Sequence, residues 1–386
     1  MEGWPALKQG ESVSGLSRKV RVLFILPSLH AGGAEHYVLR LIRVARSGAF
    51  EWHVLSPSLE RGDLHEAFEA EGAKVRYQSI GYFNPLKMLG FYRYVREGRF
   101  DVVCTLNGVF GGLTLAIGNA AGAKSRIGWH RRSTPAFKPT WGRRAYSKMA
   151  LWLLEKNSTR VLSNGRAALD HFHGVDWVND DRFGVIPNGV DAGPFLAHRE
   201  TSQEARKVLG IPGEGYVVGH VARYDPAKNH ETIFRVAREL IRQEPTATFV
   251  FCGKGTDSSA FRERLEHYGI ADHCIALGLQ PNLPRVYRSF DVFYFPSVTE
   301  GQPNALIEAM LAGIPVVASD ITPIRDMVPP ELEGALIPPC DVGLAVARIA
   351  GLIEGQRQDV ELTRRWAMCR FDPATNFGMF LEELKA

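Results

Sequence analysis

The sequence predicts an α/β protein with two doubly wound domains of similar architecture. Short apolar runs that suit buried parallel strands alternate with amphipathic helical segments in both halves of the chain. A segment from Asp191 to Gly215 interrupts this alternation and reads as a linker with one short helix. The 386 residues, 45% of them apolar and 23% charged, suffice for two domains that each bury a core.

In the first half, strands are expected where apolar residues run continuously, as in VRVLFIL at 20–26. Helices are expected where apolar residues recur with helical spacing, as in HYVLRLIRVA at 36–45, or after a suitable start such as Pro85. The expected strands span 20–26, 52–56, 74–78, 101–106, 125–130 and 159–164, and the helices lie at 36–45, after Gly62, at 85–95, before Ala121, at 142–156 and soon after 164.

The second half repeats this pattern after a Pro-Asn-Gly turn at 187–189. Strands are expected at 216–222, within 248–255 and at 274–278, and helices at 230–243 and 261–269. A last helix, from about 373 to 385, has no strand after it.

Residues 291–320, DVFYFPSVTEGQPNALIEAMLAGIPVVASD, form the most informative predicted unit. VFYFP reads as a strand, Pro303 suits the first helical position, and Gly313 and Pro315 end the helix before the strand that begins with VVA. Ligands of open α/β sheets bind outside the carboxyl ends of the strands, so the loop SVTEGQPN at 297–304 is the expected site.

An anion site with two flanking carboxylates is expected there. In a helix that starts at Pro303, the amides of Asn304 and Ala305 have no intrahelical acceptor, and the helix dipole favours an anion such as a diphosphate. Glu308 can point into the same cleft, and its two oxygens match the vicinal diol of a ribose. Glu300 could accept hydrogen bonds from sugar hydroxyls. The alternative is a solvated helix residue and a loop charge.

EGQPNALIE at 300–308 resembles the E-x7-E signature of the family-4 retaining glycosyltransferases, which have the GT-B fold. PSLHAGGAE at 27–35, VIPNGVD at 185–191 and ARYDPAKN at 222–229 are also similar to that family. The resemblance implies two Rossmann-like domains that face each other across a cleft. Residues 1–190 would bind the acceptor, 191–370 the nucleotide sugar, and a helix in 371–386 would return to the first domain.

Arg223 and Lys228 lie five residues apart in a loop between a strand and a helix. Two cations there can hold a diphosphate and stabilise the charge that develops as it leaves, although surface charge is the alternative. The resemblance implies that both bind the donor diphosphate. Ala222 stands where the family commonly has glycine.

The resemblance also implies roles for further residues. His130 would lie against the donor sugar, with a structural histidine as the alternative. The loop around Gly32 and Gly33 lacks the GxGxxG pattern, and would either approach substrates closely or form a plain turn. The expected donor-binding residues are Gly33, Gly253, Gln302, Pro303, Asn304, Ala305 and Glu308, and the expected acceptor-binding residues are Gly32, Arg131 and Arg132. The two arginines stand where other residues are usual in the family.

Charge is distributed unevenly along the chain. Residues 1–190 hold 26 Lys and Arg against 16 Asp and Glu, a balance of +10, whereas residues 191–386 hold 20 against 26, a balance of −6. Residues 131–149 hold six cations and no acid, interleaved with Phe137, Trp141 and Tyr146. This stretch suits a membrane surface or an anionic acceptor, and a solvated basic loop is the alternative.

Several features that the sequence lacks limit the expected location, disulfides and cofactors of the protein. No apolar run approaches the roughly 20 residues that span a bilayer, and the first 19 residues lack the apolar core of a signal peptide. A cytoplasmic protein is therefore expected, peripheral at most on the cytoplasmic face of the inner membrane. The five cysteines lack CxxC spacing and should be reduced structural thiols. No cofactor is expected besides the substrate and no metal, because no DxD pair appears.

These observations together predict a retaining, metal-independent glycosyltransferase of hexosyl or N-acetylhexosaminyl type. It would move a sugar from a nucleoside diphosphate, with UDP as the first choice, to a lipid-linked or saccharide acceptor in surface-glycan assembly. The alternatives are a soluble small-molecule acceptor, a non-catalytic nucleotide-sugar-binding partner, and a glycoside hydrolase that uses Glu300 and Glu308. A nucleic-acid-binding protein is a further alternative, and only the basic N-terminal half supports it.

Overall fold

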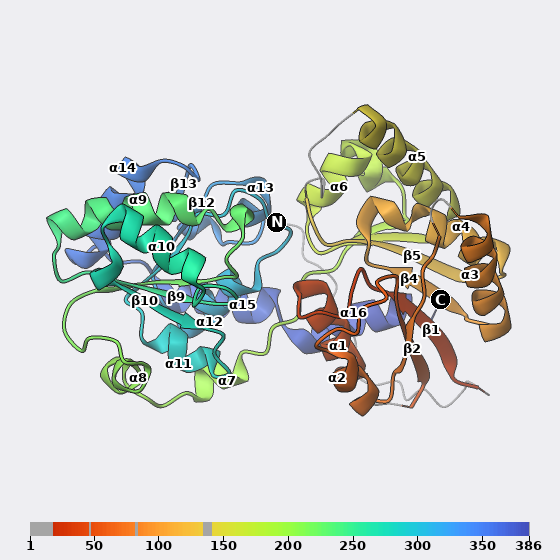
Figure 1. Ribbon diagram of the computed structural model, residues 1–386, viewed down its shortest axis with the longest axis horizontal. Helices are drawn as coiled ribbons and strands as arrows, with labels where there is room; N and C mark the ends of the chain where they lie inside the picture. The colour runs from red at the N-terminus through yellow and green to blue at the C-terminus, as the bar shows by residue number, and fades with distance from the viewer. Residues whose placement is uncertain (1–17, 46–47, 82–83, 134–140, 386) are drawn as a thin grey trace. The chain divides into compact units, whose positions relative to one another are not determined.

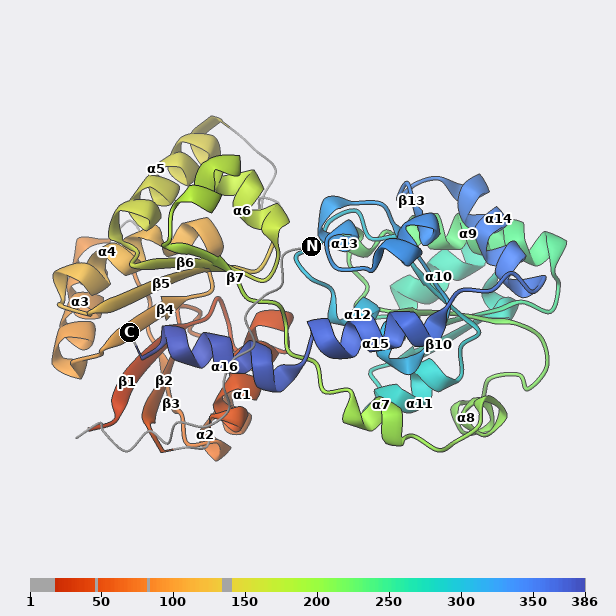
Figure 2. The ribbon, with the colours of Figure 1, turned by 180° about the vertical axis from the view of Figure 1, so that it is seen from behind.

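The computed structural model describes residues 18–45, 48–81, 84–133 and 141–385. Figures 1 and 2 show its helices and strands from two opposite sides. The chain forms two compact units. The first comprises the chain up to Trp129, Ser147–Arg160 and the last residues from Leu381, and the second comprises His130–Tyr146 and Val161–Phe380.

A seven-stranded sheet has the order β3-β2-β1-β4-β5-β6-β7. Its inner strand β1 pairs in parallel with both neighbours, so that Val22 lies opposite Trp52 and Val102. The strands are β1 (Val20–Ile25), β2 (Phe50–Ser56), β3 (Lys74–Tyr77), β4 (Val102–Thr105), β5 (Ser125–His130), β6 (Arg160–Ser163) and β7 (Phe183–Val185). Between them lie α1 (Gly33–Val44), α2 (His65–Ala70), α3 (Pro85–Gly98), η1 (Gly108–Gly111), α4 (Gly112–Ala120), α5 (Trp141–Asn157), α6 (Arg166–His173) and η2 (Val175–Asn179).

A six-stranded sheet has the order β10-β9-β8-β11-β12-β13, also with parallel neighbours. Its strands are β8 (Val217–Val221), β9 (Thr248–Cys252), β10 (Cys274–Gly278), β11 (Val292–Phe295), β12 (Val316–Ser319) and β13 (Leu336–Ile337). The helices before β11 are α7 (Gly193–Ala197), α8 (Ser202–Leu209), η3 (Pro226–Lys228), α9 (His230–Gln243), α10 (Ser259–Tyr268), η4 (Ala271–His273) and α11 (Leu283–Arg288). The later ones are α12 (Asn304–Ala312), α13 (Thr322–Arg325), η5 (Pro330–Ala335), α14 (Val342–Ile353), α15 (Val360–Arg370) and α16 (Pro373–Glu383).

The continuous apolar strands of the second sheet are explained by burial on both faces. Phe293 and Phe295 pack into the core beneath α11 and α12, whereas Val292 and Tyr294 pack into the core beneath α9 and α14. Successive residues of a strand point to opposite faces, so both sets must be apolar. In Figure 1, α9 and α11 accordingly lie on opposite sides of this sheet.

The two-sheet α/β fold and nearly all predicted strands are confirmed, but some elements were missed. The linker contains two short helices, α7 and α8, where one was expected, and α11 precedes β11 where none was expected. The chain after residue 320, for which only the last helix was predicted, also forms α13, β13, α14 and α15. Most of these are short, so their packing rather than their own periodicity decides the conformation.

The start of the central helix requires a correction. Pro303 is the N-cap of α12, with φ −74° and an extended ψ of 115°, and the first helical residue is Asn304. Proline restricts φ but leaves ψ open, so it suits either position. The amides of Asn304 and Ala305 remain in the first turn, where no intrahelical acceptor exists.

The returning C-terminal helix is confirmed as α16. Its last residues belong to the first unit, where Glu383 accepts two hydrogen bonds from the Arg160 guanidinium at 2.6 and 2.7 Å. This bidentate geometry holds the helix end in place. Within the described part of the chain, no helix is both long and apolar enough to cross a bilayer.

Candidate active site

A buried ion pair joins two of the predicted site residues. The Lys228 ammonium, at the end of η3, donates to Glu300 Oε1 at 2.5 Å, and both side chains are largely buried, with 17% and 9% of their surface exposed. The same ammonium lies 5.5 Å from the centre of the Phe295 ring. Val298 N donates to Ala227 O at 2.9 Å, which ties the loop after β11 to η3. The loop that carries Glu300 is therefore closely held against the loop that carries Lys228.

Arg223 lies in the same loop as Lys228 but in a different environment. Its side chain is 58% exposed, and its Nε is 3.3 Å from Asp225 Oδ2. An exposed guanidinium remains accessible to an anionic ligand. The predicted clamp thus consists of one buried cation that is paired with a carboxylate and one exposed cation.

Gly253 has a structural reason to be glycine. It follows β9 with a φ of +144°, a conformation that side chains disfavour, and a Cβ atom there would lie 2.2 Å from the backbone oxygen of Ala222. Gly253 therefore packs directly beneath the backbone that leads into Arg223. Its predicted place beneath a nucleotide base stays a prediction.

Glu308 is buried on α12, with 7% of its surface exposed, so a solvated helix position is wrong. The Tyr287 hydroxyl of α11 lies 3.0 Å from Glu308 Oε2 and 2.9 Å from the backbone oxygen of Ala305, and donates to this pair of acceptors. Burial and the Glu308 charge hold the pKa of Tyr287 well above its usual value, so the hydroxyl stays protonated. Sequence reasoning missed Tyr287, because the short segment LPRVYR around it has no periodic pattern that predicts a buried helix face.

Asn188 holds the N-terminus of α12, although the sequence analysis assigned this residue only to a turn. Asn188, which follows β7, makes hydrogen bonds to both Gln302 and Asn304. Pro303 is buried between these two residues. A Pro-Asn-Gly triplet indicates a turn locally, and nothing in the sequence signals a contact 114 residues away.

His130, at the end of β5, is buried, with 1% of its surface exposed. Its Nε2 lies 3.0 Å from Nε2 of His173 in α6, and its ring stacks on Phe172 at 5.1 Å between ring centres. Burial and then the neighbouring His173 lower the pKa of His130 to about 3, so its ring is neutral. The predicted contact of His130 with a donor sugar stays a prediction.

The residues after His130 reach the loop of Glu300. Ser133 donates to the backbone oxygen of Glu300 from its amide at 3.4 Å and from its hydroxyl. Arg131 is half-buried and Arg132 is exposed. Their predicted role in acceptor binding remains untested, and Ser133 was not anticipated.

Gly32 and Gly33 belong to the other unit, at the start of α1. Gly32 is the N-cap residue with extended backbone, and a side chain there would collide with the carboxylate of Glu35. That carboxylate is the end of a flexible side chain and can move aside, so the contact does not by itself require glycine. The contacts of both glycines with substrates remain predictions.

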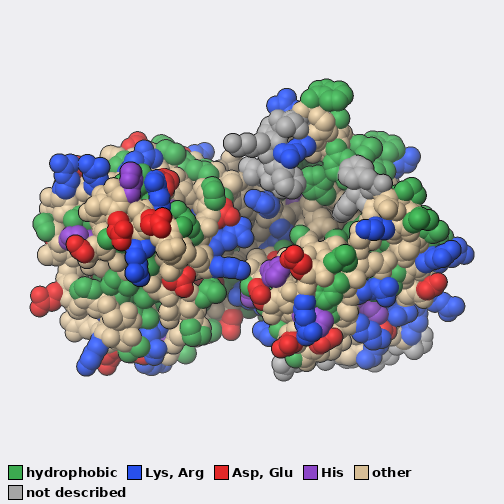
Figure 3. All heavy atoms as spheres, in the orientation of Figure 1, with side chains coloured by type: hydrophobic (Ala, Val, Ile, Leu, Met, Phe, Trp, Pro, Cys, Tyr) green, Lys and Arg blue, Asp and Glu red, His purple; other side chains and the backbone are tan. Residues whose placement is uncertain are grey.

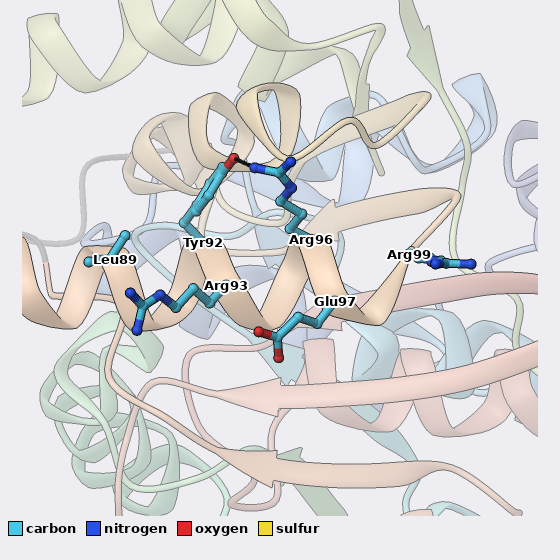
Figure 4. A pocket seen from close by; sticks show the side chains of 6 residues that line it. All are labelled: Leu89, Tyr92, Arg93, Arg96, Glu97 and Arg99. Carbon is cyan, nitrogen blue, oxygen red and sulfur yellow. Dashed lines mark hydrogen bonds between the residues drawn. The ribbon is translucent and has the colours of Figure 1, made fainter.

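One hollow lies elsewhere, along α3. Figure 4 shows its lining, in which the Arg96 guanidinium donates to the Tyr92 hydroxyl at 2.8 Å. It contains none of the predicted site residues. Among the described residues, no group of three or more His, Cys, Asp or Glu side chains is arranged to hold a metal ion.

Known proteins resemble this chain in both halves. The model "Glycosyltransferase Family 4" matches residues 31–193, and "Glycosyl transferases group 1" matches residues 201–367. The chain is 27% identical to EpsF of Bacillus subtilis, a protein assigned as a glycosyltransferase, over 79% of this chain and 80% of that protein. It is 26% identical, over 65% of each, to the UDP-Gal:alpha-D-GlcNAc-diphosphoundecaprenol alpha-1,3-galactosyltransferase of Escherichia coli.

The fold is also found among solved structures. The crystal structure of HepE from Anabaena in complex with UDP-glucose matches with a TM-score of 0.77, at 20% identity, over 95% of this chain and 99% of that chain. The two family models together cover most of the chain, including twelve of the thirteen described strands and missing only β1. The chain therefore belongs to the family-4, group 1 glycosyltransferases of the GT-B fold.

Proposed function

We propose that the protein transfers a sugar from a UDP-sugar to an acceptor with retention of configuration and without a metal ion. The observation that carries this proposal is the buried Lys228–Glu300 pair beside the amides that begin α12. The names of two similar proteins support the choice of donor: the E. coli relative is a UDP-Gal transferase, and HepE was crystallised with UDP-glucose.

The charges of the site suit a departing diphosphate. Lys228, the exposed Arg223 and the amides of Asn304 and Ala305 supply positive charge and donors where negative charge grows during transfer. The departing phosphate oxygen would take the proton of the acceptor hydroxyl, so that bond formation and bond breaking occur on one face of the sugar. Glu300, which is held by Lys228, would orient the sugar by accepting hydrogen bonds from its hydroxyls.

The choice of donor is tested by calorimetric titration of the protein with UDP, GDP and ADP. We expect UDP to bind at least about tenfold more tightly than GDP and ADP, because a pocket built for one base leaves its polar groups unpaired with another. Radiolabelled UDP-sugars then identify the sugar. Preference for GDP or ADP would replace the UDP donor, and binding of none of the three would overturn the proposed function.

The two carboxylates are expected to act at different steps. Glu308→Gln should weaken UDP binding about tenfold, because a ribose diol loses a charged acceptor that Tyr287 holds in place. Glu300→Gln should change UDP affinity little and lower the turnover number, because its partner would be the sugar. Titration with UDP and steady-state kinetics separate the two. Equal loss of UDP affinity in both variants would contradict this division.

We further propose that the acceptor is anchored at an anionic membrane surface, on the cytoplasmic face. One face of α5 exposes Trp141, Met149 and Trp152, with 87%, 51% and 54% of their surface accessible, and Lys148 and Lys156 are exposed on the same face. The Lys156 ammonium lies 4.9 Å from the centre of the Trp152 ring. Figure 3 shows apolar and basic side chains next to each other in this region. Such a mixture suits a lipid headgroup layer.

Only some residues of the basic stretch, 131–149, support the membrane proposal. Trp141 is exposed as expected, but Tyr146 is partly buried, which raises its pKa. Phe137 lies outside the described residues. Arg131 is half-buried and engaged in contacts of its own. The cations to test are therefore Arg132, Arg143, Arg144 and Lys148, all of which are exposed.

Co-sedimentation with vesicles tests the membrane proposal. The wild type should sediment with vesicles that contain phosphatidylglycerol at low salt and be released at high salt, because each cation contributes about 1 kcal/mol near such a surface. Changing the four exposed cations to Glu should abolish binding, and changing Trp141 and Trp152 to Ser should weaken it. Changing Lys207, Arg238, Arg242 and Arg262, exposed on other helices, to Glu is the matched control. Equal losses in both four-fold variants would contradict a specific surface.

A further inference from the structure

A buried asparagine outside the predicted site makes three hydrogen bonds to the start of α12. Asn188 has 2% of its surface exposed. Its backbone N–H donates to Gln302 Oε1 at 2.6 Å, and its Nδ2 donates to the backbone oxygen of Gln302 at 3.0 Å and to Asn304 Oδ1 at 2.8 Å. These bonds reach both residues that flank Pro303.

The chemistry of these partners determines which way the amide side chains point. A backbone N–H can only donate, so the Gln302 atom that it meets must be the oxygen. A backbone carbonyl can only accept, so the Asn188 atom that it meets must be the nitrogen, and this nitrogen in turn requires the oxygen of Asn304. Asn188 thus sets the orientation of both side chains without ambiguity.

The NH2 groups of the Gln302 and Asn304 side chains are available as donors. Gln302 and Asn304 are half-buried, and neither NH2 group donates to another residue in the described part of the chain. Both lie within two residues of the α12 amides that carry the positive end of the helix dipole. A diphosphate has more acceptor oxygens than two backbone amides can satisfy.

We infer that Asn188 is a positioning residue that turns the NH2 groups of Gln302 and Asn304 toward the donor diphosphate. The inference rests on the proposed function, in which the α12 N-terminus binds that diphosphate. Asn188 is itself held from behind, because Asn376 Nδ2 donates to its backbone oxygen at 3.0 Å. A buried, fully bonded support of this kind reduces the freedom that a surface loop would otherwise have.

Asn304→Asp is the first test, because it separates binding from stability. The carboxylate still accepts from Asn188 but replaces the NH2 donor with a negative oxygen. A negative residue in the first turn favours the helix, so the unfolding temperature should equal or exceed that of the wild type. The affinity for UDP should fall at least about tenfold, as expected when a hydrogen bond to a charged group is lost.

Asn188→Asp is the second test, with the ratio of UDP affinity to UMP affinity as its readout. An aspartate places a carboxylate against two acceptor oxygens, those of the Gln302 backbone and the Asn304 side chain. The Asn304 amide must therefore turn its NH2 group toward residue 188 and away from the diphosphate. The ratio of UDP affinity to UMP affinity should then fall at least about tenfold. Asn157→Asp is the matched control. It changes another buried amide, in α5, whose nitrogen donates to the backbone oxygen of Leu153 instead of to the α12 segment. Its ratio should equal that of the wild type.

The outcomes distinguish this inference from the proposed function. A wild type that binds none of the nucleoside diphosphates would overturn both. A wild type that binds UDP more tightly than UMP, with Asn304→Asp unchanged in UDP affinity, would overturn the positioning role alone. So would an equal fall of the ratio in Asn188→Asp and Asn157→Asp. If Asn188→Asp does not fold, the result for Asn304→Asp decides.

Discussion

Replacing Lys228 with alanine is expected to lower the turnover number about 100- to 1,000-fold, the effect of removing one preorganised group that stabilises the charge of a transition state. Lys228 is the buried member of the predicted clamp, and its ammonium contacts Glu300 at 2.5 Å. The change removes charge from the departing diphosphate and also removes the partner of the Glu300 carboxylate. The measurement is transfer from the UDP-sugar that the wild type uses, with kcat and KM determined separately.

Stability measurements separate these two consequences. Glu300 has only 9% of its side chain exposed, so its loss of a partner should destabilise the Lys228→Ala variant by about 3 kcal/mol. The double variant Lys228→Ala/Glu300→Gln removes the buried charge and should regain most of this stability while it stays inactive. Arg223→Ala is the control, because its exposed guanidinium can be removed without a cost in stability. Turnover of Lys228→Ala within tenfold of the wild type would contradict the assigned role.

Lowering the pH from 7 to 5 is expected to destabilise the protein by at least about 4 kcal/mol, because several histidines are buried in the neutral form. Burial, together with the neighbouring His173, lowers the pKa of His130 to about 3; burial also lowers the pKa of His230 to about 4 and that of His220 well below its ordinary value. In the unfolded chain each titrates near 6.5. Their stabilising effect is therefore complete above pH 6.5 and is lost as the pH falls toward the folded pKa values. The loss at pH 5 is about 2 kcal/mol for each of His130 and His230, and His220 adds to it in the same direction.

Urea unfolding at the two pH values, followed by tryptophan fluorescence, measures this effect. At pH 5 most carboxylates are ionised in both the folded and unfolded states, so the histidines dominate the change. His230→Phe is the informative variant. The ring of His230 packs against Tyr224 and Phe261, so a phenylalanine ring can take its place in aromatic surroundings. The variant should lose about 2 kcal/mol of the acid sensitivity, and an unchanged sensitivity would show that the buried ring is not responsible.

Most of the strands and helices could be predicted from local sequence patterns. Continuous apolar runs such as VRVLFIL can be satisfied only by burial on both faces, which is what parallel strands between helices provide. The helix HETIFRVARELIRQ coincides with α9 because its apolar residues recur with helical spacing, and its buried face includes Ile233, Phe234 and Leu240. The short helix α11 lacked such a pattern, and its conformation depends on packing against the chain that follows.

The residues of the candidate site also fall into two groups, those that the sequence predicted and those that only the structure revealed. Charge, glycine and proline at strand ends indicated Lys228, Glu300, Gly253 and the start of α12, because the topology of an open α/β sheet brings those ends to one edge. The sequence alone therefore determined the fold class and the family, and it predicted the position of an anion site. Only the tertiary structure decided that Lys228 pairs with Glu300, that Tyr287 holds Glu308, and that Asn188 orients Gln302 and Asn304. The physical reason is that a buried polar group requires a partner, but the partner can come from any distance along the chain.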